Sequence, residues 1–579
     1  MDTVKLKING MEVEAPAGST IIQAANLAGV RIPSLCYLKD LNEIGACRIC
    51  MVEVKGAKGL VASCVYPVNE GMEVFTNTEK VRKARKMTLE LILSNHRMEC
   101  LTCRRSGTCE LQALAQEFGV DQVRFQTPNM KPEIEDSAIH LVRENSKCVL
   151  CRRCVAACQN QGVGVIGCNE RGFATEIGSP FGRDLVETAC ISCGQCIVNC
   201  PTGALTERDD TAKVWAALEN PEKHVVVATA PSVRAGLGEC FCMPIGTNVE
   251  GKMVAALRRL GFNQVFDVDT AADFTIIEEG SELLNRIKEG GTLPLITSCS
   301  PGWVRYAEQY HPDFLPNISS CKSPQGMFGS LMKTYYAEKM GIDPKDLFVV
   351  SVMPCTAKKF EANRPELGHD GMADVDYVLT TRELARMIKE AGIDFVNLPD
   401  EDFDSLMGES TGAAVIFGAT GGVMEAALRT AYEAITGKTL EDVNFTAVRG
   451  MDGIKEASVK IGDLDVNVAV ASSTGKASEL LEMVKKGEKN YTFIEIMGCP
   501  GGCVNGGGQP IVSSQIRNWT DIRPLRAKAL YDEDAALSVR KSHELPAITK
   551  LYDEYFGKPN SHKAHELLHT TYTARKKYN

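Results

Sequence analysis

Cysteine is the residue type with the greatest chemical capacity in this chain, and its distribution is uneven. The chain has 579 residues and 23 cysteines, sixteen of them before residue 201 and seven after it. In a reducing compartment, clustered thiols bind metal or do redox chemistry more often than they form disulfides. The first part of the chain therefore predicts dense metal binding, whereas the second part carries a few thiols in selected places.

One cysteine spacing occurs twice between residues 148 and 201. Both copies read C-x2-C-x2-C-x3-C, with Pro201 after the second copy and Gln159 after the first. This is the run of bacterial two-cluster ferredoxins, in which the fourth cysteine of each copy binds the other cluster. We therefore expect two [4Fe–4S] clusters with crossed ligand sets, the first held by Cys148, Cys151, Cys154 and Cys200 and the second by Cys190, Cys193, Cys196 and Cys158.

Two further groups of candidate ligands precede this repeat. The four thiols of the first group favour a [2Fe–2S] cluster, although their spacing differs from the plant type. Zinc would suit both groups and stays open as an alternative, but the neighbouring ferredoxin repeat favours iron–sulfur clusters. Four clusters in sequence order would form a route for electrons. The first group is Cys36, Cys47, Cys50 and Cys64, and the second is His96 with Cys100, Cys103 and Cys109.

Later cysteines follow three short apolar stretches that read as strands. "LPLITSC", "DLFVVSVMPC" and "TFIEIMGC" end at Cys299, Cys355 and Cys499, and Cys503 lies four residues beyond the last. Because ligands gather at the carboxyl ends of strands in open α/β sheets, we expect these thiols to converge. Cys499 and Cys503 would share a face if a helix began there. The remaining thiols, such as Cys168, are expected to pack as small apolar residues.

The elements that must position these residues change along the chain. Alternating residues precede a helix that starts near Ser19, a second helix is expected over 79–95, and strands alternate with helices beyond residue 210. The expected fold class is α+β and α/β multidomain, with ferredoxin-like modules followed by a large α/β domain. The expected domains are a [2Fe–2S] β-grasp ferredoxin-like domain over 1–80, a one-histidine, three-cysteine [4Fe–4S] domain over 81–125, a two-[4Fe–4S] ferredoxin domain over 126–209, a large α/β domain over 210–520 and its C-terminal helical tail over 521–579.

Charge and hydropathy exclude two classes of partner. A formal net charge of −10 argues against a nucleic-acid surface, which needs an excess of Lys and Arg. No uninterrupted apolar run reaches the ~20 residues that cross a bilayer, and residues 1–18 lack the apolar core of a signal peptide. The sequence therefore predicts a cytoplasmic protein with no membrane span.

Three stretches, read together, resemble the signature loops of [FeFe]-hydrogenases. They are "TSCSPGW" (297–303), "MPCTAKKFE" (353–361) and "EIMGCPGGCVNGGGQ" (495–509). The front end resembles the multi-cluster form of that family, and its first two modules also resemble the large peripheral subunit of NADH dehydrogenase. The resemblance implies reversible H2 oxidation and proton reduction at an H-cluster bound by residues 210–520. That cofactor is a [4Fe–4S] cubane joined to a two-iron unit with CO, cyanide and dithiolate ligands.

The resemblance also implies roles for individual residues. Cys355 and Cys499 would hold the cubane, Cys503 would bridge to the two-iron unit, and the Lys358 ammonium would donate to a cyanide. Met353 and residues 230–232, including Ser232, would line the pocket. The implied proton path runs through Cys299, Glu282, Ser319 and Glu279, with Arg286 beside it.

The first loop departs from the family at Ser300. Two adjacent cysteines are usual there, one handling protons and the next binding the cubane. Ser300 could ligate as a harder oxygen donor, or Cys299 could ligate and leave proton transfer to Ser300 or water. As a third option, Cys321 could supply the missing thiol. We expect Cys299 to keep the proton role.

Within the family, the chain resembles catalytic subunits of NAD(P)-linked, sometimes electron-bifurcating complexes of anaerobes. We therefore expect one [2Fe–2S] cluster, three accessory [4Fe–4S] clusters and the H-cluster, loaded by maturation proteins. Electrons would pass to ferredoxin, to a flavin-containing NAD(P)-linked subunit with a small [2Fe–2S] subunit, or to both. The alternative functions are an H2 sensor or electron relay with little turnover, and a zinc-binding scaffold.

Overall fold

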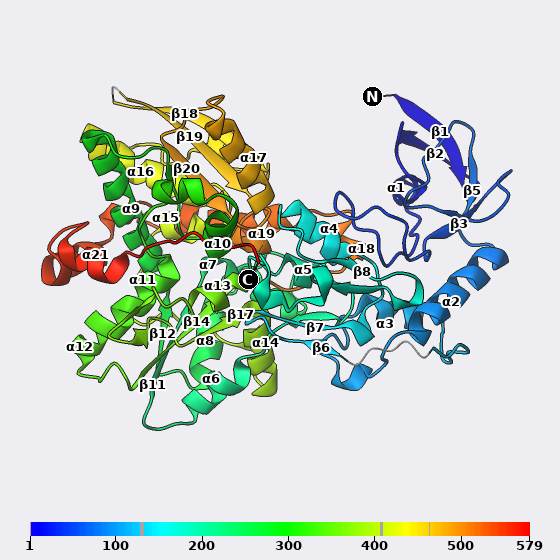
Figure 1. Ribbon diagram of the computed structural model, residues 1–579, viewed down its shortest axis with the longest axis horizontal. Helices are drawn as coiled ribbons and strands as arrows, with labels where there is room; N and C mark the ends of the chain where they lie inside the picture. Colours follow the sequence, from blue (N-terminus) through cyan, green and yellow to red (C-terminus); the bar gives the residue numbers. More distant parts are fainter. Residues whose placement is uncertain (1, 128–132, 406–408, 463, 579) are drawn as a thin grey trace.

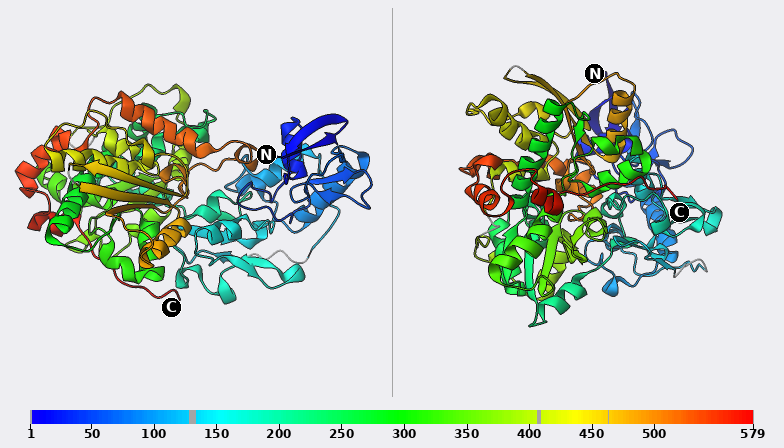
Figure 2. Two further views of the ribbon diagram at one scale, coloured as in Figure 1. Left: turned by 90° about the horizontal axis from the view of Figure 1, so that it is seen from above. Right: turned by 60° about the vertical axis from the view of Figure 1, so that its left-hand side comes forward.

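The computed structural model describes residues 2–127, 133–405, 409–462 and 464–578. Figure 1 shows an elongated molecule in which the N-terminal stretch (blue) lies at one end and the second half of the chain (green to red) forms the other. The ferredoxin-type repeat (cyan) lies between them, and the further views keep this order (Figure 2).

The N-terminal stretch folds as a mixed sheet packed on one helix. Leu6 and Ile8 alternate with exposed residues and are buried, as a strand with one covered face requires. Helix α1 (Ile21–Leu27) begins close to Ser19, and Gln23 Oε1 accepts from Thr20 N at 2.8 Å at its first turn. Helix α2 (Glu79–Ser94) occupies the range that the sequence predicts. The sheet has the strand order β2 (Met11–Pro16), β1 (Thr3–Ile8), β5 (Glu73–Phe75), β3 (Met51–Val54), β4 (Val61–Ala62).

The cysteine repeat lies on two short helices beside a small sheet. Helix α4 (Arg153–Asn160) carries Cys154 and Cys158, and α5 (Gln195–Val198) carries Cys196. The helices and the sheet share one apolar core. The sheet order is β10 (Leu205–Glu207), β7 (Leu141–Glu144), β6 (Ile134–Glu135).

Two four-stranded sheets build most of the second half of the chain. All strands of the first sheet are parallel, and in the second sheet only β18 runs antiparallel to its neighbour. Strands β11, β14 and β20 are nearly continuous buried apolar runs, as parallel strands covered on both faces require. The orders are β12 (Gln264–Asp267), β11 (His224–Thr229), β14 (Leu347–Met353), β17 (Tyr377–Thr380) and β13 (Leu295–Ile296), β20 (Phe493–Met497), β19 (Leu464–Ser472), β18 (Ile454–Ile461).

Three helices begin close to the carboxyl ends of these strands. Helix α9 (Asp269–Glu289) follows β12, α10 (Pro301–Tyr310) follows the segment after β13, and α13 (Ala357–Glu361) follows β14. The segments between strand and helix therefore carry side chains to one edge of both sheets.

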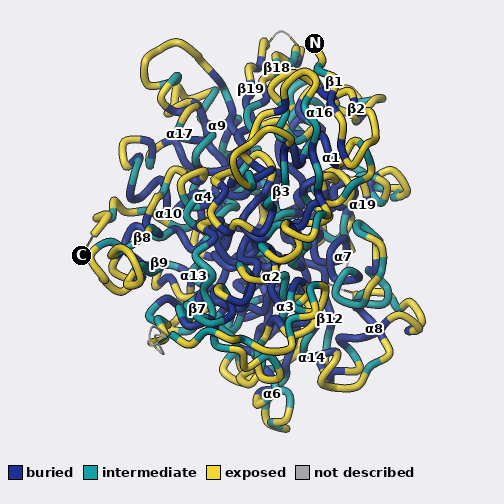
Figure 3. Tube along the Cα trace, turned by 90° about the vertical axis from the view of Figure 1, so that its right-hand side faces the viewer, coloured by how far each residue is buried: buried dark blue, intermediate teal, exposed yellow. Residues whose placement is uncertain are grey.

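The C-terminal helices pack against the first of these sheets. Ile548 of α20 (Pro546–Leu551) and Leu568 of α21 (His562–Leu568) belong to the same apolar core as β11 and β14. Figure 3 shows the buried trace at the centre of the molecule and the exposed trace at its rim. Within the described residues, no helix is long and apolar enough to cross a membrane.

Candidate active site and cluster ligands

An apolar cavity lies where strands from both sheets end. The volume open to the centre of a water-sized sphere is about 90 Å³. Ala230 and Pro231 after β11 and Met353 at the end of β14 form part of its wall. Ser232 does not line it, because its hydroxyl donates to Gly418 O at 3.3 Å. The cavity also receives four cysteines from the segments that follow β13, β14 and β20, namely Cys299, Cys355, Cys499 and Cys503.

These cysteines have the chemistry of a cluster site. Burial raises the pKa of the Cys355, Cys499 and Cys503 thiols, so the thiolates would need a nearby cation in order to form. Iron ions of a cluster supply that positive charge. The donor set and the apolar wall therefore fit an H-cluster.

Glycines let the loop after β20 approach the end of β14 closely. A Cβ at Gly506 would lie 2.1 Å from Pro354 O, which no side chain tolerates. No helix forms at Cys499 as the sequence allowed, because Gly501 and Gly502 have φ values of 89° and 92°. A single turn of 3-10 helix begins at Cys503. Cys499 and Cys503 reach the same cavity through this glycine turn and not through a shared helix face.

Lys358 places a positive charge at the cavity wall. Its Nζ donates to Ser323 Oγ at 2.7 Å, to Glu361 Oε2 at 2.8 Å and to Cys299 O at 3.3 Å. Gln325 lines the same wall, and its Nε2 donates to Glu361 Oε2 at 3.1 Å. Sequence reasoning missed Gln325 and Phe417 in the lining, since neither lies in the three loops, although Gln325 directly follows the "KSP" turn that begins a helix.

Asp269 at the start of α9 lines the cavity, and Glu279 further along the same helix acts on Cys299. The Cys299 side chain is half-buried, and desolvation and then the charge of Glu279 raise the pKa of its thiol. Burial and the neighbouring Glu282 raise the pKa of Glu279 to about 8, although hydrogen bonds from the Ser319 hydroxyl and the Ser298 main chain lower it. Glu279 Oε1 has no hydrogen-bond partner within the described part of the chain.

Glu282 lies one turn closer to the C-terminal end of α9 than Glu279, and its side chain is partly exposed to solvent. Ser319 Oγ donates to Glu282 Oε2 at 2.7 Å, and Arg286 Nη2 donates to Glu282 Oε1 at 2.6 Å. The side chains of Glu282 and Arg286 are 14% and 17% exposed. The order expected from the sequence is therefore reversed, because Glu279 adjoins Cys299 and Glu282 follows Ser319.

Ser300 and Cys321 occupy different regions. Ser300 lines the cavity and its Oγ accepts from Gly498 N at 3.1 Å, directly before Cys499. Cys321 is fully buried, and its Sγ lies 4.0 Å from Glu282 Oε2. The option that Cys321 replaces the missing cluster ligand is wrong, since its thiol faces the outer glutamate and does not line the cavity.

The cysteines of the ferredoxin-type repeat adopt the crossed arrangement that the spacing predicts. Cys148, Cys151, Cys154 and Cys200 line one small cavity. After burial, neighbouring thiols raise the pKa of Cys190, Cys193 and Cys196, and Cys158 is among them in all three cases. The expectation for Cys168 as a packing residue is wrong, because it is exposed.

In the first of the two earlier groups, thiols lie close together in pairs, and in the second, Cys103 lies near Cys109. Cys36 Sγ accepts from Cys47 N at 3.4 Å, and the sulfurs of Cys50 and Cys64 are 3.3 Å apart. His96 is buried, its Nδ1 has no partner among the described residues, and burial lowers its pKa to about 4. A neutral imidazole can bind a metal through a ring nitrogen that has no other partner, so His96 is able to act as a ligand. Burial raises the pKa of the Cys109 thiol, and the nearby Cys103 raises it further.

Both early groups adjoin the same part of the repeat. Asn42 Nδ2 donates to Cys36 O at 2.9 Å and to Cys151 O at 3.0 Å, which joins the first group to the repeat. A Cβ at Gly203 would lie 2.7 Å from Cys103 Sγ, which brings the histidine group close to Cys200. Both early groups therefore lie beside the first half of the repeat, and Cys36, Cys47 and Cys109 also share one apolar core with Cys151.

The other half of the repeat contacts the apolar cavity's own loops. Thr356 Oγ1 donates to Ser192 O at 2.8 Å, and Gln195 Nε2 donates to Asn505 O at 2.9 Å. Cys193 is one of the thiols that raise the pKa of Cys499, after burial and Cys355. The second cysteine set of the repeat is thus the neighbour of the cavity.

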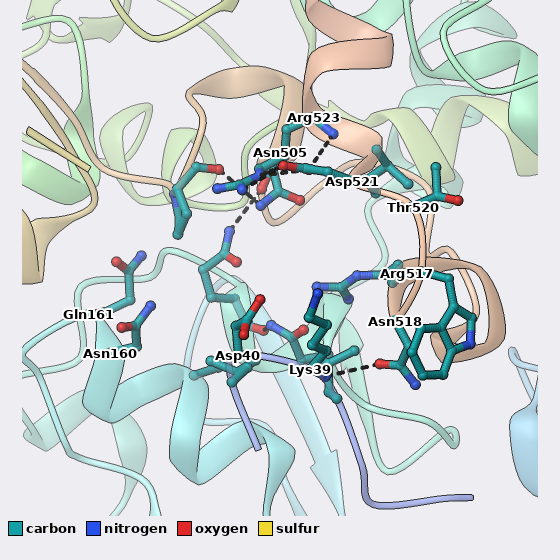
Figure 4. A pocket seen from close by; sticks show the side chains of 18 residues that line it. Lys39, Asp40, Asn160, Gln161, Asn505, Arg517, Asn518, Thr520, Asp521 and Arg523 are labelled. Atoms are coloured by element: carbon teal, nitrogen blue, oxygen red, sulfur yellow. Dashed lines mark hydrogen bonds and ion pairs between the residues drawn. The ribbon is translucent and has the colours of Figure 1, made fainter. Parts of the chain in front are cut away.

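A separate polar cavity lies at the seam between the N-terminal stretch, the repeat and the C-terminal segment (Figure 4). Lys39 N donates to Asn518 Oδ1 at 3.0 Å across this seam, and Arg523 pairs with Asp521 at 2.7 Å. No cysteine is among its lining residues within the described chain. The lining of this cavity therefore comes from several modules, and its described residues offer no thiol to a cluster.

Family models match successive parts of the chain. The longest match is to the iron only hydrogenase large subunit, C-terminal domain, over residues 223–507. The other matches are a 2Fe-2S iron-sulfur cluster binding domain over 1–79, the NADH-ubiquinone oxidoreductase-G iron-sulfur binding region over 85–124, a 4Fe-4S binding domain over 185–206 and the iron hydrogenase small subunit over 520–575.

Relatives match the chain over its whole length. It is 49% identical to an NADP-reducing hydrogenase subunit of Solidesulfovibrio fructosivorans, over 100% of both chains. It is 46% identical to iron hydrogenase 1 of Clostridium pasteurianum, over 98% of this chain and 99% of that one. A solved structure of an [FeFe]-hydrogenase variant from Chlamydomonas reinhardtii is 43% identical, covers 64% of this chain and 100% of its own, and has a TM-score of 0.57.

Proposed function

The chain belongs to the [FeFe]-hydrogenase family, and we propose that it catalyses the reversible oxidation of H2 at an H-cluster held in the apolar cavity. The observation that carries this proposal is the convergence of Cys355, Cys499 and Cys503 on a cavity that also receives Cys299 and Lys358. When bound, an H-cluster supplies the redox chemistry that cleaves H2 and a base that takes its proton.

Cys299 and Glu279 are the residues that would exchange protons with the cavity. The raised pKa of the Cys299 thiol keeps it protonated, so it can donate a proton and recover one from Glu279. Glu279 has a pKa of about 8, which lets it take up and release protons near neutral pH. Its unpartnered Oε1 is available to such a donor.

Ser319 and Glu282 would carry the proton onward. The Ser319 hydroxyl donates to Glu282 and also lowers the pKa of Glu279, so it could accept a proton from Glu279 and donate its own to Glu282. Arg286 holds Glu282 at the partly exposed end of this path. The hydrogen bonds of Glu282 with Ser319 and Arg286 would form the outer part of the route from Glu279 to solvent.

Lys358 and Ser300 would position the cofactor. The Lys358 ammonium is held by Ser323 and Glu361, so it presents a fixed donor to an anionic ligand in the cavity. Ser300 lies beside Gly498 and Cys499, which favours its oxygen over the Cys299 thiol as the fourth contact of a cubane. Oxygen is a harder donor than thiolate, so we expect a weaker bond to iron there.

The accessory cysteine groups would hold one [2Fe–2S] and three [4Fe–4S] clusters. Contacts through Asn42 and Gly203 support a branched route, in which both N-terminal clusters pass electrons to the cluster at Cys148. The contacts of Gln195 and Thr356 support onward transfer from the second repeat cluster to the cavity. The identity to a subunit of an NADP-reducing hydrogenase supports an NAD(P)-linked flavoprotein partner, with ferredoxin as the alternative acceptor.

Hydrogen isotope exchange tests this function at the cavity itself. Protein matured anaerobically with a loaded two-iron unit is incubated under D2 in H2O, and HD and H2 are followed by mass spectrometry. We expect exchange by the unsubstituted protein, with a loss of about 100-fold in Cys299→Ala, since a positioned proton donor contributes 10²–10⁴-fold. Absence of exchange by fully loaded protein would favour a sensor or relay.

A further inference from the structure

A second set of metal-binding side chains lies at the outer end of the proposed proton path. Glu282, Cys321 and His569 each offer one ligand atom, and these atoms lie within 4.8 Å of one another. Cys321 and His569 are buried and Glu282 is half-buried. The set combines a thiol, an imidazole and a carboxylate, and it lies apart from the cysteines that line the cavity.

Main-chain hydrogen bonds fix the two buried ligands relative to each other. Cys321 and His569 form an antiparallel bridge between the segment before α11 (Pro324–Leu331) and the end of α21. Lys322 N donates to Leu568 O at 2.7 Å, and Thr570 N donates to Ser320 O at 2.7 Å. The third ligand is held from α9, so the three donors come from three separate and well-anchored elements.

The imidazole is oriented as in known metal sites. His569 Nε2 lies 3.2 Å from Glu278 Oε2, while Nδ1 lies 2.8 Å from Ser320 Oγ on the side of Glu282. Glu278 is itself held by Tyr552 Oη at 2.5 Å and Asn560 N at 2.8 Å. A carboxylate behind the distal nitrogen fixes the tautomer and strengthens a coordinating imidazole.

The local charge favours a cation. Glu278 and Glu282 lie one turn apart on α9, and Arg286 pairs with Glu282. Lys322 points away, since its Nζ pairs with Asp374 at 2.8 Å. Arg286 balances only one of these two carboxylates. A divalent cation at Cys321 would therefore offset the remaining negative charge.

We propose that Glu282, Cys321 and His569 bind a divalent cation of the zinc class, and that its binding stops proton transfer through Glu282. A thiolate, an imidazole and a carboxylate are the ligands that Zn²⁺ takes, whereas Mg²⁺ and Ca²⁺ prefer oxygen alone. Tetrahedral zinc bonds set sulfur and oxygen about 3.6 Å apart, close to the 4.0 Å between Cys321 Sγ and Glu282 Oε2. On binding, the S–H proton of Cys321 leaves to solvent as the metal–sulfur bond forms, and no electrons are transferred.

The inhibitory half of this proposal rests on the proposed function, whereas the metal site does not. Matured holoenzyme is assayed for H2-dependent dye reduction at free Zn²⁺ concentrations set by a chelator. We expect saturable inhibition that excess chelator reverses, with unchanged iron content and visible absorption. In Cys321→Ser, which keeps the size of the side chain, the inhibitory concentration should rise at least about tenfold relative to that variant's own metal-free rate. Cys242→Ser, at an exposed thiol, is the matched control and should keep the original value.

Zinc X-ray absorption tests the ligands independently of turnover. Holoenzyme with one equivalent of Zn²⁺ should show one sulfur neighbour at about 2.3 Å and nitrogen or oxygen neighbours at about 2.0–2.2 Å. The sulfur neighbour should disappear in Cys321→Ser and persist in Cys242→Ser. Zinc that keeps its sulfur in Cys321→Ser would overturn the site, and zinc bound with that sulfur but without inhibition would overturn its effect on Glu282.

Discussion

At the scale of single residues, we propose that Cys299 and Ser300 divide two tasks that the family usually gives to two thiols. Cys299 lies toward Glu279, and Ser300 lies toward Gly498 and Cys499. The division follows from backbone direction, because successive side chains of an extended segment point to opposite sides. The thiol is thus left on the side where protons must leave.

If Ser300 is the fourth contact of the cubane, removing its oxygen should weaken that cluster. We expect Ser300→Ala to lose part of the cubane iron and of its electron paramagnetic resonance signal. Ser300→Cys should keep the signal and change its reduction potential, since thiolate is the softer donor. Iron content and signal in Ser300→Ala equal to those of the unsubstituted protein would show that Ser300 is not a ligand.

The pKa of Glu279 sets an expected pH dependence. Burial and Glu282 raise this pKa to about 8, so the carboxyl is protonated below that pH and ionised above it. H2 evolution needs a proton donor and should fall as the pH rises through about 8. H2 oxidation needs an acceptor and should rise over the same range. Glu279→Gln should lower both rates about 100-fold, whereas Glu289→Gln, exposed at the end of the same helix, should leave both unchanged.

Residue types at this site could be predicted from the sequence, but the order of the glutamates could not. Glu279 and Glu282 are three residues apart and lie on one face of α9, so spacing alone cannot say which one adjoins the cavity. The answer depends on Ser298 and Ser319, which come from distant segments. Cys321 was misjudged for the same reason, because its nearness to Ser319 in sequence did not give the direction of its thiol.

At the scale of elements, glycines decide how closely the cluster loops approach one another. A Cβ at Gly507 would lie 2.2 Å from Cys193 O and 2.7 Å from Gly194 Cα. Gly507→Ala should therefore destabilise the junction by about 1–3 kcal/mol, as overpacking does. We expect a lower midpoint of thermal unfolding and slower reduction of the accessory clusters by H2.

Gly59→Ala is the matched control for this prediction, because a Cβ there meets no atom within 4 Å. Its unfolding midpoint and reduction rate should match those of the unsubstituted protein. If Gly507→Ala also matched them, the close approach of the two loops would not be a determinant of stability or electron transfer.

The strands and helices around the site could be expected from apolar patterns, whereas the glycine turn could not. β14 and β20 are continuous apolar runs, and α2 begins and ends close to the expected residues. The turn at Cys499 depends on positive φ values at Gly501 and Gly502, and those are set by packing against Thr420 and Arg523. Such long-range contacts leave no local pattern in the sequence.

At the scale of the whole molecule, the N-terminal stretch and the second half of the chain lie at opposite ends, with the ferredoxin-type repeat between them (Figure 1). The spacing gives the membership of each group but not the neighbours of each group. Those neighbours depend on how the modules dock, for example through Arg153, which contacts Cys36 O and Glu110. The order of the groups along the chain therefore does not give the electron route by itself.

A branched route predicts unequal effects of losing single groups. Cys64→Ala removes one branch and Cys109→Ala removes the other, so each should lower the rate of H2-dependent ferredoxin reduction only in part. Cys148→Ala removes the common point and should lower the rate below that of either variant. Equal rates in all three variants, with cluster content verified by iron analysis, would contradict the branched route.

The most direct test of the account is H2-dependent reduction of a viologen dye by the full chain, matured anaerobically and shown to carry the two-iron unit. We expect rapid dye reduction, since Ser300 leaves Cys299 and Glu279 in place as the proton route. Full iron content and a loaded two-iron unit without dye reduction would contradict it.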